Sequence, residues 1–467
     1  MKPETIDFIQ KYVRALKDNN AVVFAGAGLS VDSGFFDWKK LLAPLAKQLG
    51  LDIEEEYDLT ALAQYFVDAN GGRGEITQTL VDRYNQPDVK ISEKHRILAR
   101  LPIQAYWTTN FDILIEQALF EAGKTADVKR TQNDLLLNLS KRDAIVYKMH
   151  GDISLAHETV LTKHEYEDYN KIRELFSNAF KSDFVAKTFL FIGFSFLDPN
   201  LDYLISRIRS TVGTNVKPDY YFIKIDADPK KQNRLQIRAN SLKKYGLQPI
   251  WIDNYDEIEI ILKEIEIRYL RNSIFISGSA DVYDPLSKLD AESFLQLLSK
   301  VISAQNYKIV TGFGAGVGSS IINGVLDNME EKRNKSLDSY IVMRPFPKIA
   351  NKTKTLAELR KEYREGFISL AGIALFVFGN KNGGADLSDG VEKEFNIALE
   401  KGLKVIPIGA TGYMAERLWK KVYNDFNTYY PGEPALKVLF EKLGDVKTSF
   451  SDIVGVTVEI INHLNSN

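Results

Sequence analysis

Two apolar runs in the first third of the sequence end in polar side chains that could do chemistry. One run leads through Thr109 to Asn110 and Asp112, and a second ends at His150 and Asp152. An imidazole can take or give a proton near neutral pH, while an amide or a carboxylate can orient a hydroxyl or a water. Ligands bind outside the carboxyl ends of the strands in open α/β sheets, so we expect these side chains to face one site.

A glycine-rich turn follows the first apolar run, in the segment FAGAGLSVDSG. It places Gly26, Ala27, Gly28 and Ser30 directly after a strand and before a helical stretch. Small residues here let backbone amides approach a pyrophosphate, and a helix N-terminus adds positive potential. Tight turns also need glycine for backbone reasons, so this motif alone leaves nucleotide binding and a structural turn as equal alternatives.

The polar strand ends also have simpler explanations. Asn110 could cap a helix that begins near Ile113, and His150 could satisfy a buried backbone group. Neither explanation accounts for the convergence of several polar strand ends, Ser195 among them, on one glycine-rich turn. The combination favours a nucleotide site.

The elements that must position these residues alternate between short apolar runs and longer amphipathic stretches. Such alternation is typical of an α/β domain whose parallel sheet is covered on both faces. Helices are predicted over 113–123, 199–210 and 255–270. The predicted strands are residues 21–26, 104–109, 144–149, 187–194, 220–225 and 249–252.

The same alternation restarts after a charged stretch near Arg271. It predicts a second α/β domain, with strands at 273–280, at the start of 307–320, and at 339–344, 373–380 and 404–409. The expected domains are therefore residues 1–271 and 272–467, both Rossmann-like with a parallel sheet.

Composition excludes several classes of protein. A chain of 467 residues is too long for one hydrophobic core, and a net charge of −2 gives no electrostatic argument for nucleic acid or membrane partners. The sequence has no cysteine, which excludes disulfides, thiol nucleophiles and cysteine-ligated zinc, and the five histidines show no metal-ligand spacing. No apolar run approaches the roughly 18 residues needed to span a bilayer. We expect a cytoplasmic protein without a metal.

Four motifs in the first domain carry a family resemblance. GAGLSVDSG, TTNFD, MHGD and GFSFLDPNL, in this order, resemble the sirtuin-like NAD-binding fold, and most of all its prokaryotic defence branch. The resemblance covers roughly residues 10 to 270. The chain departs from protein-deacylating sirtuins in lacking a four-cysteine zinc module and in having Thr109 where they have glutamine. The resemblance therefore implies NAD⁺ binding and nicotinamide release rather than acyl-lysine chemistry.

The resemblance also implies roles for individual residues. Asn110 would hold the ribose hydroxyls and the attacking water, Asp112 would anchor the carboxamide, and His150 would act as general base or proton relay. Cleavage of the nicotinamide–ribose bond needs orientation more than a strong acid, because nicotinamide is already a good leaving group. The implied NAD-binding residues are Gly26, Ala27, Gly28, Ser30, Thr109, Ser195 and Asp226.

Three glycine-rich segments of the second domain, SGSA, TGFGAGVG and FGNKNGGADLSDGVEKEF, follow predicted strands. Each alone is explained by a tight turn, but together they resemble the SLOG superfamily, which is related to cytokinin-activating phosphoribohydrolases. The implied ligand-binding residues are Gly278, Ser279, Gly314, Arg364, Lys381 and Glu394.

In this set Arg364 and Lys381 would bind phosphates, and Glu394 would accept from ribose hydroxyls. The residues inserted before Gly390 favour ligand sensing over catalysis. The alternative for Arg364 and Glu394 is an exposed helical arginine and a helix-stabilising glutamate.

A sirtuin-like domain followed by a SLOG domain resembles the effectors of the bacterial Thoeris anti-phage system. This resemblance implies an NAD⁺ glycohydrolase that depletes NAD⁺ as an abortive response to infection. Its activator would be a cyclic ADP-ribose isomer made by a TIR-domain partner protein, and its assembly a homotetramer. The alternatives are a protein deacylase, a phosphoribohydrolase with Glu394 as the catalytic residue, and a non-catalytic nucleotide-binding scaffold.

Overall fold

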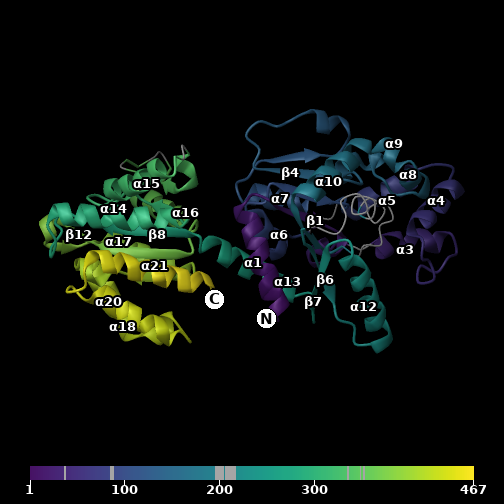
Figure 1. Cartoon of the computed structure of the whole chain (residues 1–467). Coiled ribbons are helices and arrows are strands. Elements are labelled where there is room, and N and C mark those ends of the chain that lie inside the picture. The colour runs from purple at the N-terminus through teal and green to yellow at the C-terminus, as the bar shows by residue number, and fades with distance from the viewer. Residues whose placement is uncertain are drawn as a thin grey trace. The chain divides into compact units, whose positions relative to one another are not determined.

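A parallel sheet of seven strands, in the order β3-β4-β2-β1-β5-β6-β7, organises the N-terminal half of the chain. The six strands predicted there are confirmed, and β3 is an addition that the apolar pattern did not indicate. The strands are β1 (Ala21–Ala25), β2 (Ala105–Thr108), β3 (Ala126–Lys129), β4 (Ala144–Lys148), β5 (Thr188–Ile192), β6 (Asp219–Lys224) and β7 (Leu247–Ile252) (Figure 1).

The central strand of this sheet, β1, lies between β2 on one side and β5 on the other. The chain first extends the sheet from β1 through β2 to β4, and then crosses back to β5, β6 and β7. The strand order therefore reverses at β1. In open α/β sheets the crevice at such a reversal, outside the carboxyl ends of the strands, is where ligands bind.

Helices cover both faces of the seven-stranded sheet. Phe24 and Trp107 pack on Phe180 of α10, whereas Val23 and Tyr106 border a small cavity lined by residues of α6 and α7. The helices are α1 (Pro3–Lys17), α2 (Ala27–Ser30), α3 (Trp38–Gln48), α4 (Leu59–Ala69), α5 (Gly74–Tyr84), α6 (Glu93–Arg100), α7 (Leu114–Glu121), α8 (Lys163–Glu167), α9 (Tyr169–Ile172), α10 (Glu174–Ala186), α12 (Pro229–Lys243) and α13 (Glu257–Leu270).

A second sheet, of five parallel strands in the order β10-β9-β8-β11-β14, organises the C-terminal half. Its strands confirm the five predicted there, and its order also reverses at the central strand, β8, which lies between β9 and β11. The strands are β8 (Ser273–Ser279), β9 (Lys308–Thr311), β10 (Ile341–Met343), β11 (Ile373–Phe378) and β14 (Lys404–Pro407), and a small antiparallel pair is formed by β12 (Asn380–Lys381) and β13 (Asp386–Leu387).

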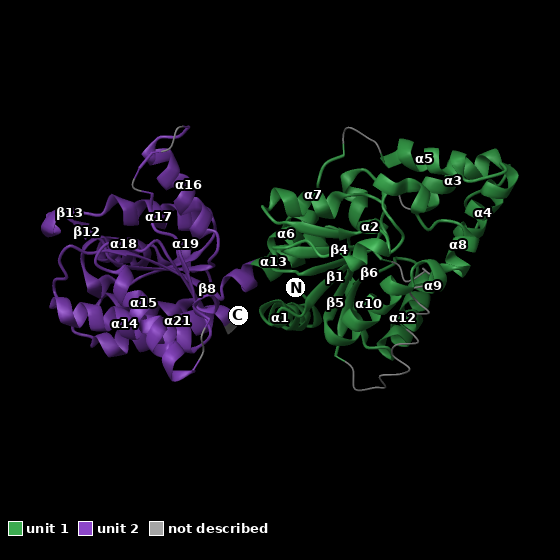
Figure 2. Cartoon of the chain, turned by 90° about the horizontal axis from the view of Figure 1, so that it is seen from above, with its two compact units in different colours: residues 1–266 green, residues 267–467 purple. Residues whose placement is uncertain are grey.

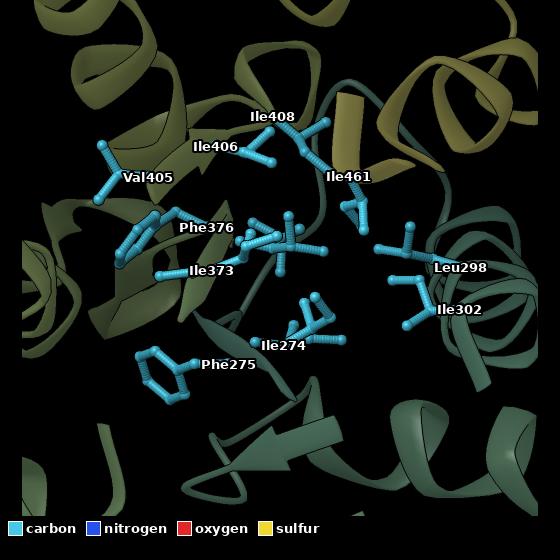
Figure 3. Close-up of a cluster of buried hydrophobic side chains, with 14 of the residues drawn as sticks. Ile274, Phe275, Leu298, Ile302, Ile373, Phe376, Val405, Ile406, Ile408 and Ile461 are labelled. Carbon is cyan, nitrogen blue, oxygen red and sulfur yellow. The ribbon is translucent and has the colours of Figure 1, made fainter. Parts of the chain in front are cut away.

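Successive residues of β8 enter the apolar layers on the two faces of this sheet (Figure 3). Ile274 lies on the side of Leu298 and Ile302 of α14, and Phe275 packs on Phe367 of α16, with ring centroids 5.3 Å apart. The helices are α14 (Lys288–Ala304), α15 (Gly318–Glu331), α16 (Leu356–Ile368), α17 (Asp389–Glu400), α18 (Tyr413–Asn424), α19 (Phe426–Tyr429), α20 (Pro434–Gly444) and α21 (Phe450–Ser466).

The two sheets belong to two compact units, unit 1 (residues 1–266) and unit 2 (residues 267–467) (Figure 2). The division falls within α13, whereas the boundary expected at Arg271 follows that helix. The computed structural model describes residues 1–35, 38–84, 89–194, 205, 217–333, 336–347, 349–350 and 353–466. Within these ranges, every helix is too short or too polar to cross a lipid bilayer.

Candidate functional site

The polar side chains that follow β1 and β2 form a hydrogen-bonded cluster. The Asn110 amide donates to the Gly26 carbonyl over 3.0 Å and to Ser30 Oγ over 3.1 Å. Ser30 Oγ in turn donates to Asp112 Oδ2 over 2.8 Å. The side chains of Ser30, Asn110 and Asp112 are all buried. The structure thus joins three of the predicted site residues at the strand-order reversal.

Thr108, the last residue of β2, sets the backbone path into this cluster. Its hydroxyl donates to the Ala25 carbonyl over 2.9 Å and accepts the Asn110 N–H over 2.9 Å. The explanation of Asn110 as a helix cap is wrong, because its amide turns back toward the glycine-rich turn. Asp112 instead accepts the first N–H of α7, from Leu114, over 3.1 Å.

His150 is the second residue after β4, and it is buried. Its Nδ1 lies 3.3 Å from the Tyr166 hydroxyl, and the rings of Tyr166 and Tyr169 pack edge-on against the imidazole. Thr108 pairs with Lys148 in the sheet, so Asn110 and His150 each lie two residues beyond a paired position. The two side chains therefore leave neighbouring strand ends at the same level.

Close packing explains the glycines of the turn after β1. A Cβ on Gly26 would lie 2.4 Å from the Gly193 carbonyl oxygen, and one on Gly28 would lie 2.8 Å from Gly193 Cα. The N–H groups of Gly26 and Gly28 donate to the Ile192 and Gly193 carbonyls. These two amides are therefore engaged with the end of β5, and α2, only four residues long, contributes a weaker dipole than the sequence suggested.

The other NAD-binding residues implied by the resemblance lie differently. Thr109 is partly buried beside Asn110. Asp226 orders the turn into α12: its N–H donates to Gln232, and its carboxylate accepts from the Asp228 N–H. No contact among the described residues joins Asp226 to the Asn110 cluster. Ser195 and, apart from residue 205, the helix expected over 199–210 lie outside the described residues.

In unit 2 the residues implied as ligand-binding meet around a buried ion pair. Arg364 Nε lies 3.3 Å from Glu394 Oε1, and Ser277 Oγ donates to Glu394 Oε2 over 2.6 Å. The guanidinium also stacks over Phe346, 4.7 Å from the ring centroid. Burial raises the pKa of Glu394, and the hydrogen bonds from Ser277 and Arg364 offset part of that rise. The alternative of an exposed arginine is therefore wrong, and Glu394, although it lies in α17, is buried in this pair.

The first turn of α17 separates the two cations of this region. A Cβ on Gly390 would lie 3.3 Å from a terminal nitrogen of Arg364, so glycine leaves space for the guanidinium. On the other side, Lys381 Nζ lies 2.7 Å from the carboxylate of Asp389. Arg364 and Lys381 thus flank the start of one helix.

The remaining three predicted residues lie where the ends of β8, β9 and β11 meet. A Cβ on Gly314 would lie 1.9 Å from the Gly278 carbonyl oxygen, which requires glycine there. Ser279 Oγ donates to the backbone of Asn380 over 3.2 Å. Sequence reasoning missed Asn380, whose buried side chain accepts the N–H groups of Asp281 and Val282 and so holds the loop after β8.

Sequence reasoning also missed Thr108 and Tyr166 in unit 1. Thr108 was identifiable in principle, since it precedes the polar strand end. Tyr166 comes from a helix of five residues, α8, and nothing in its local sequence indicates that it contacts His150.

Two regions of the chain match known families. Residues 104–250 match a family described as SIR2-like domain, and residues 257–464 match one described as the Sir2- and TIR-associating SLOG family. With the two parallel sheets, these matches define a protein class in which a SIR2-like domain precedes a SLOG domain.

Relatives of similar length narrow this class. The protein named NAD(+) hydrolase ThsA from Cytobacillus dafuensis is 44% identical, in an alignment that covers 98% of this chain and 96% of that protein. The protein of the same name from Bacillus cereus (strain MSX-D12) is 41% identical over the full length of both. The chain therefore belongs to the ThsA family. Defense-associated sirtuin 2 of Bacillus subtilis is 27% identical over 50% of this chain and 24% of its own length.

Proposed function

We propose that this chain is an NAD⁺ glycohydrolase that cleaves NAD⁺ to nicotinamide and ADP-ribose. Its membership of the ThsA family, whose relatives are named NAD(+) hydrolases, supports this reaction. The observation that carries the proposal is the buried cluster of Ser30, Asn110 and Asp112 at the strand-order reversal of a SIR2-like domain.

The hydrogen bonds of Asn110 define what it offers a substrate. Its Nδ2 donates to two protein oxygens, and no described residue donates to its Oδ1. The carbonyl end of the amide is therefore available to accept a hydrogen bond from a ribose hydroxyl or a water. Holding that water near the anomeric carbon supplies the orientation that the departure of nicotinamide requires.

His150 is the proton acceptor in this proposal. The Tyr166 hydroxyl lies 3.3 Å from Nδ1 and helps to orient the ring, and the imidazole would exchange a proton with the attacking water or with a ribose hydroxyl. Asp112, held by Ser30, would accept from the carboxamide of nicotinamide. Orientation and proton transfer, rather than a strong acid, then carry the reaction.

Unit 2 is the regulatory half of the proposal. A cyclic ADP-ribose isomer, made by a TIR-domain partner protein, would bind at Arg364, Lys381 and the glycine-rich strand ends. Its phosphates would compete with Glu394 for Arg364 and with Asp389 for Lys381, and Glu394 would then face the ribose hydroxyls. Such a ligand activates the enzyme only if it binds the active state more tightly than the resting state. The active form would be a homotetramer that depletes NAD⁺ as an anti-phage response.

The test is to incubate the purified chain with NAD⁺, alone and with cyclic ADP-ribose or each of its isomers, and to separate the products by chromatography. We expect equal amounts of nicotinamide and ADP-ribose, formed faster with one of the isomers. NAD⁺ consumption only in the presence of an acetyl-lysine peptide would instead identify a deacylase. No consumption in any mixture would leave a nucleotide-binding scaffold.

A further inference from the structure

A fully buried lysine lies behind the proposed catalytic cluster. Lys148 is the last residue of β4, and its side chain is only 1% exposed. The ammonium donates to the backbone carbonyl of Asp112 and lies 3.1 Å from Asp152 Oδ2 and 3.2 Å from Glu116 Oε1. It thus contacts the loop after β2, the first turn of α7 and the loop after its own strand.

This ammonium stays charged at neutral pH. Burial lowers the pKa of Lys148, but Glu116 and Asp152 outweigh that effect, and the net pKa is above the ordinary lysine value. Burying charges is costly, and replacing a whole buried ion pair by apolar side chains of similar volume often gives an equally stable or more stable fold. A buried lysine at this strand end therefore calls for a role beyond stability.

The contacts of Lys148 link the two loops that carry the proposed catalytic residues. On one side, its partner Asp112 follows Asn110 and accepts the Ser30 hydroxyl. On the other side, its partner Asp152 follows His150 and accepts both the N–H and the hydroxyl of Ser154, over 2.8 and 2.5 Å. The Ile153 N–H also donates directly to the Phe111 carbonyl over 2.9 Å, so a change at Lys148 would alter the spacing of the two loops without separating them.

We propose that Lys148 is a positioning residue for NAD⁺ hydrolysis, whose ammonium fixes the separation of Asn110 and His150 without touching the substrate. This inference rests on the proposed function of unit 1. It assigns Lys148 to the step between substrate binding and bond cleavage, because a shift between water and base costs rate far more than affinity.

A lysine that only stabilises the fold would affect activity differently from a positioning residue. A pair of variants distinguishes these two roles. Lys148→Met removes the ammonium and leaves two carboxylates without it, so stability falls. Adding Glu116→Gln removes one of those carboxylates, and we expect the melting temperature of the double variant to recover toward that of the wild type. If Lys148 only stabilised the fold, kcat would recover as well.

The positioning role predicts that kcat of the double variant stays at least about tenfold below wild type while KM changes by less than about threefold. Should the methionine variants fail to fold, Asp152→Asn keeps the shape of the side chain and weakens its charge contacts with Lys148 and with Arg130, whose Nε lies 3.5 Å from Asp152 Oδ1. It should show the same fall in kcat at nearly constant KM.

The matched control is another buried lysine–aspartate pair in the same sheet. Lys129 on β3 lies 2.8 Å from Asp127, and its side chain is 4% exposed. Lys129→Met should lower the melting temperature and leave kcat within about twofold of wild type, because no contact joins it to the Asn110 cluster among the described residues.

All variants are measured as the full chain with NAD⁺ and the cyclic ADP-ribose isomer that activates the wild type most. Wild type that does not hydrolyse NAD⁺ would overturn the proposed function. If wild type is active but either the double variant or Asp152→Asn has a normal kcat, the positioning role of Lys148 is wrong. The proposed function of unit 1 is then unaffected.

Discussion

The polar side chains at the strand-order reversals of the two sheets differ in how their charges are balanced. At the reversal in unit 1, neutral groups of Ser30 and Asn110 lead to Asp112 through hydrogen bonds, and an amide oxygen remains for a ligand. At the reversal in unit 2, the cation of Arg364 is already neutralised by Glu394. The same topology thus supplies one preorganised site and one site whose charges are satisfied internally.

This difference suggests how the two sites divide their work. A preorganised cluster suits catalysis, because its groups need no rearrangement at the moment of reaction. An ion pair between Arg364 and Glu394 suits a receptor, because an anionic ligand must compete for the guanidinium and so changes the contacts between α16 and α17. A change in contacts at this position is what a regulatory ligand can use to favour one conformation.

The largest effect is expected from substitutions of the proposed catalytic residues in unit 1. We expect Asn110→Ala and His150→Ala to bind NAD⁺ but to hydrolyse it at least about 10²-fold more slowly. Substrate loss on chromatography measures the rate. His157→Ala, which changes an exposed histidine of the same unit, should behave like wild type. Turnover within a few fold of wild type in either the Asn110 or the His150 variant would show that the catalytic site does not depend on that residue.

The rigidity of the unit 1 site is tested at its glycine-rich turn. Gly26→Ala places a methyl 2.4 Å from a backbone oxygen that belongs to the neighbouring strand end. Overpacking of this kind costs roughly 1–3 kcal/mol, so the melting temperature should fall by several degrees. Gly74→Ala is the control, since nothing lies within 4 Å of the added carbon. Equal melting temperatures for the two variants would contradict the close packing against β5.

The acid sensitivity of unit 1 should depend on His95, which lies behind the cluster. Burial lowers the pKa of His95 to about 4, and Asp112 and Asp32 only partly offset this. The unfolded chain binds this proton near pH 6.5 and the folded chain does not. The contribution of neutral His95 to the free energy of unfolding is therefore complete above pH 6.5. It is lost as the pH falls toward 4, which lowers the free energy of unfolding by about 3 kcal/mol.

Denaturant unfolding at pH 7 and pH 4.5 measures this change in stability. The fluorescence of Trp38, Trp107 and Trp251 monitors the unfolding of unit 1. His95→Asn keeps a hydrogen-bonding group beside the Ser92 hydroxyl and removes the titrating group. Its free energy of unfolding should fall less between the two pH values than that of wild type. Parallel losses would mean that His95 does not titrate as its burial requires.

The smallest effect is expected from metal removal. The described residues contain no group of three or more histidine, aspartate or glutamate side chains arranged to hold a metal ion. Turnover of NAD⁺ after dialysis against a chelator should match that of untreated enzyme. A loss of activity that zinc or magnesium restores would require a metal in the mechanism.

The sequence predicted the strands of both sheets better than the contacts between their ends. Apolar runs revealed buried strands, but β3 escaped because its inward residues, Asp127 and Lys129, are charged and satisfy each other. The order of the sequence motifs predicted that Ser30, Asn110 and Asp112 share one site. It could not reveal Lys148 or Tyr166, because their contacts depend on strand register and on helices that are distant in sequence.

The residues of unit 2 show the same limit. The glycines were predicted, since tight turns require them, but the engagement of Arg364 with Glu394 was not. An arginine and a glutamate on separate helices, 30 residues apart, carry no sequence signal that they form a buried pair. Their burial is a property of the packing between α16 and α17.

A ligand bound at Arg364 is proposed to control the chemistry at Asn110. NAD⁺ turnover against the concentration of the activating cyclic ADP-ribose isomer, measured for wild type, Arg364→Ala and Arg360→Ala, tests this coupling. Arg360 is an exposed arginine on the same helix and serves as the control. We predict that wild type and Arg360→Ala are activated alike, and that Arg364→Ala shows no activation at any concentration. Overlapping curves for all three proteins would leave unit 2 without a sensing role at this residue.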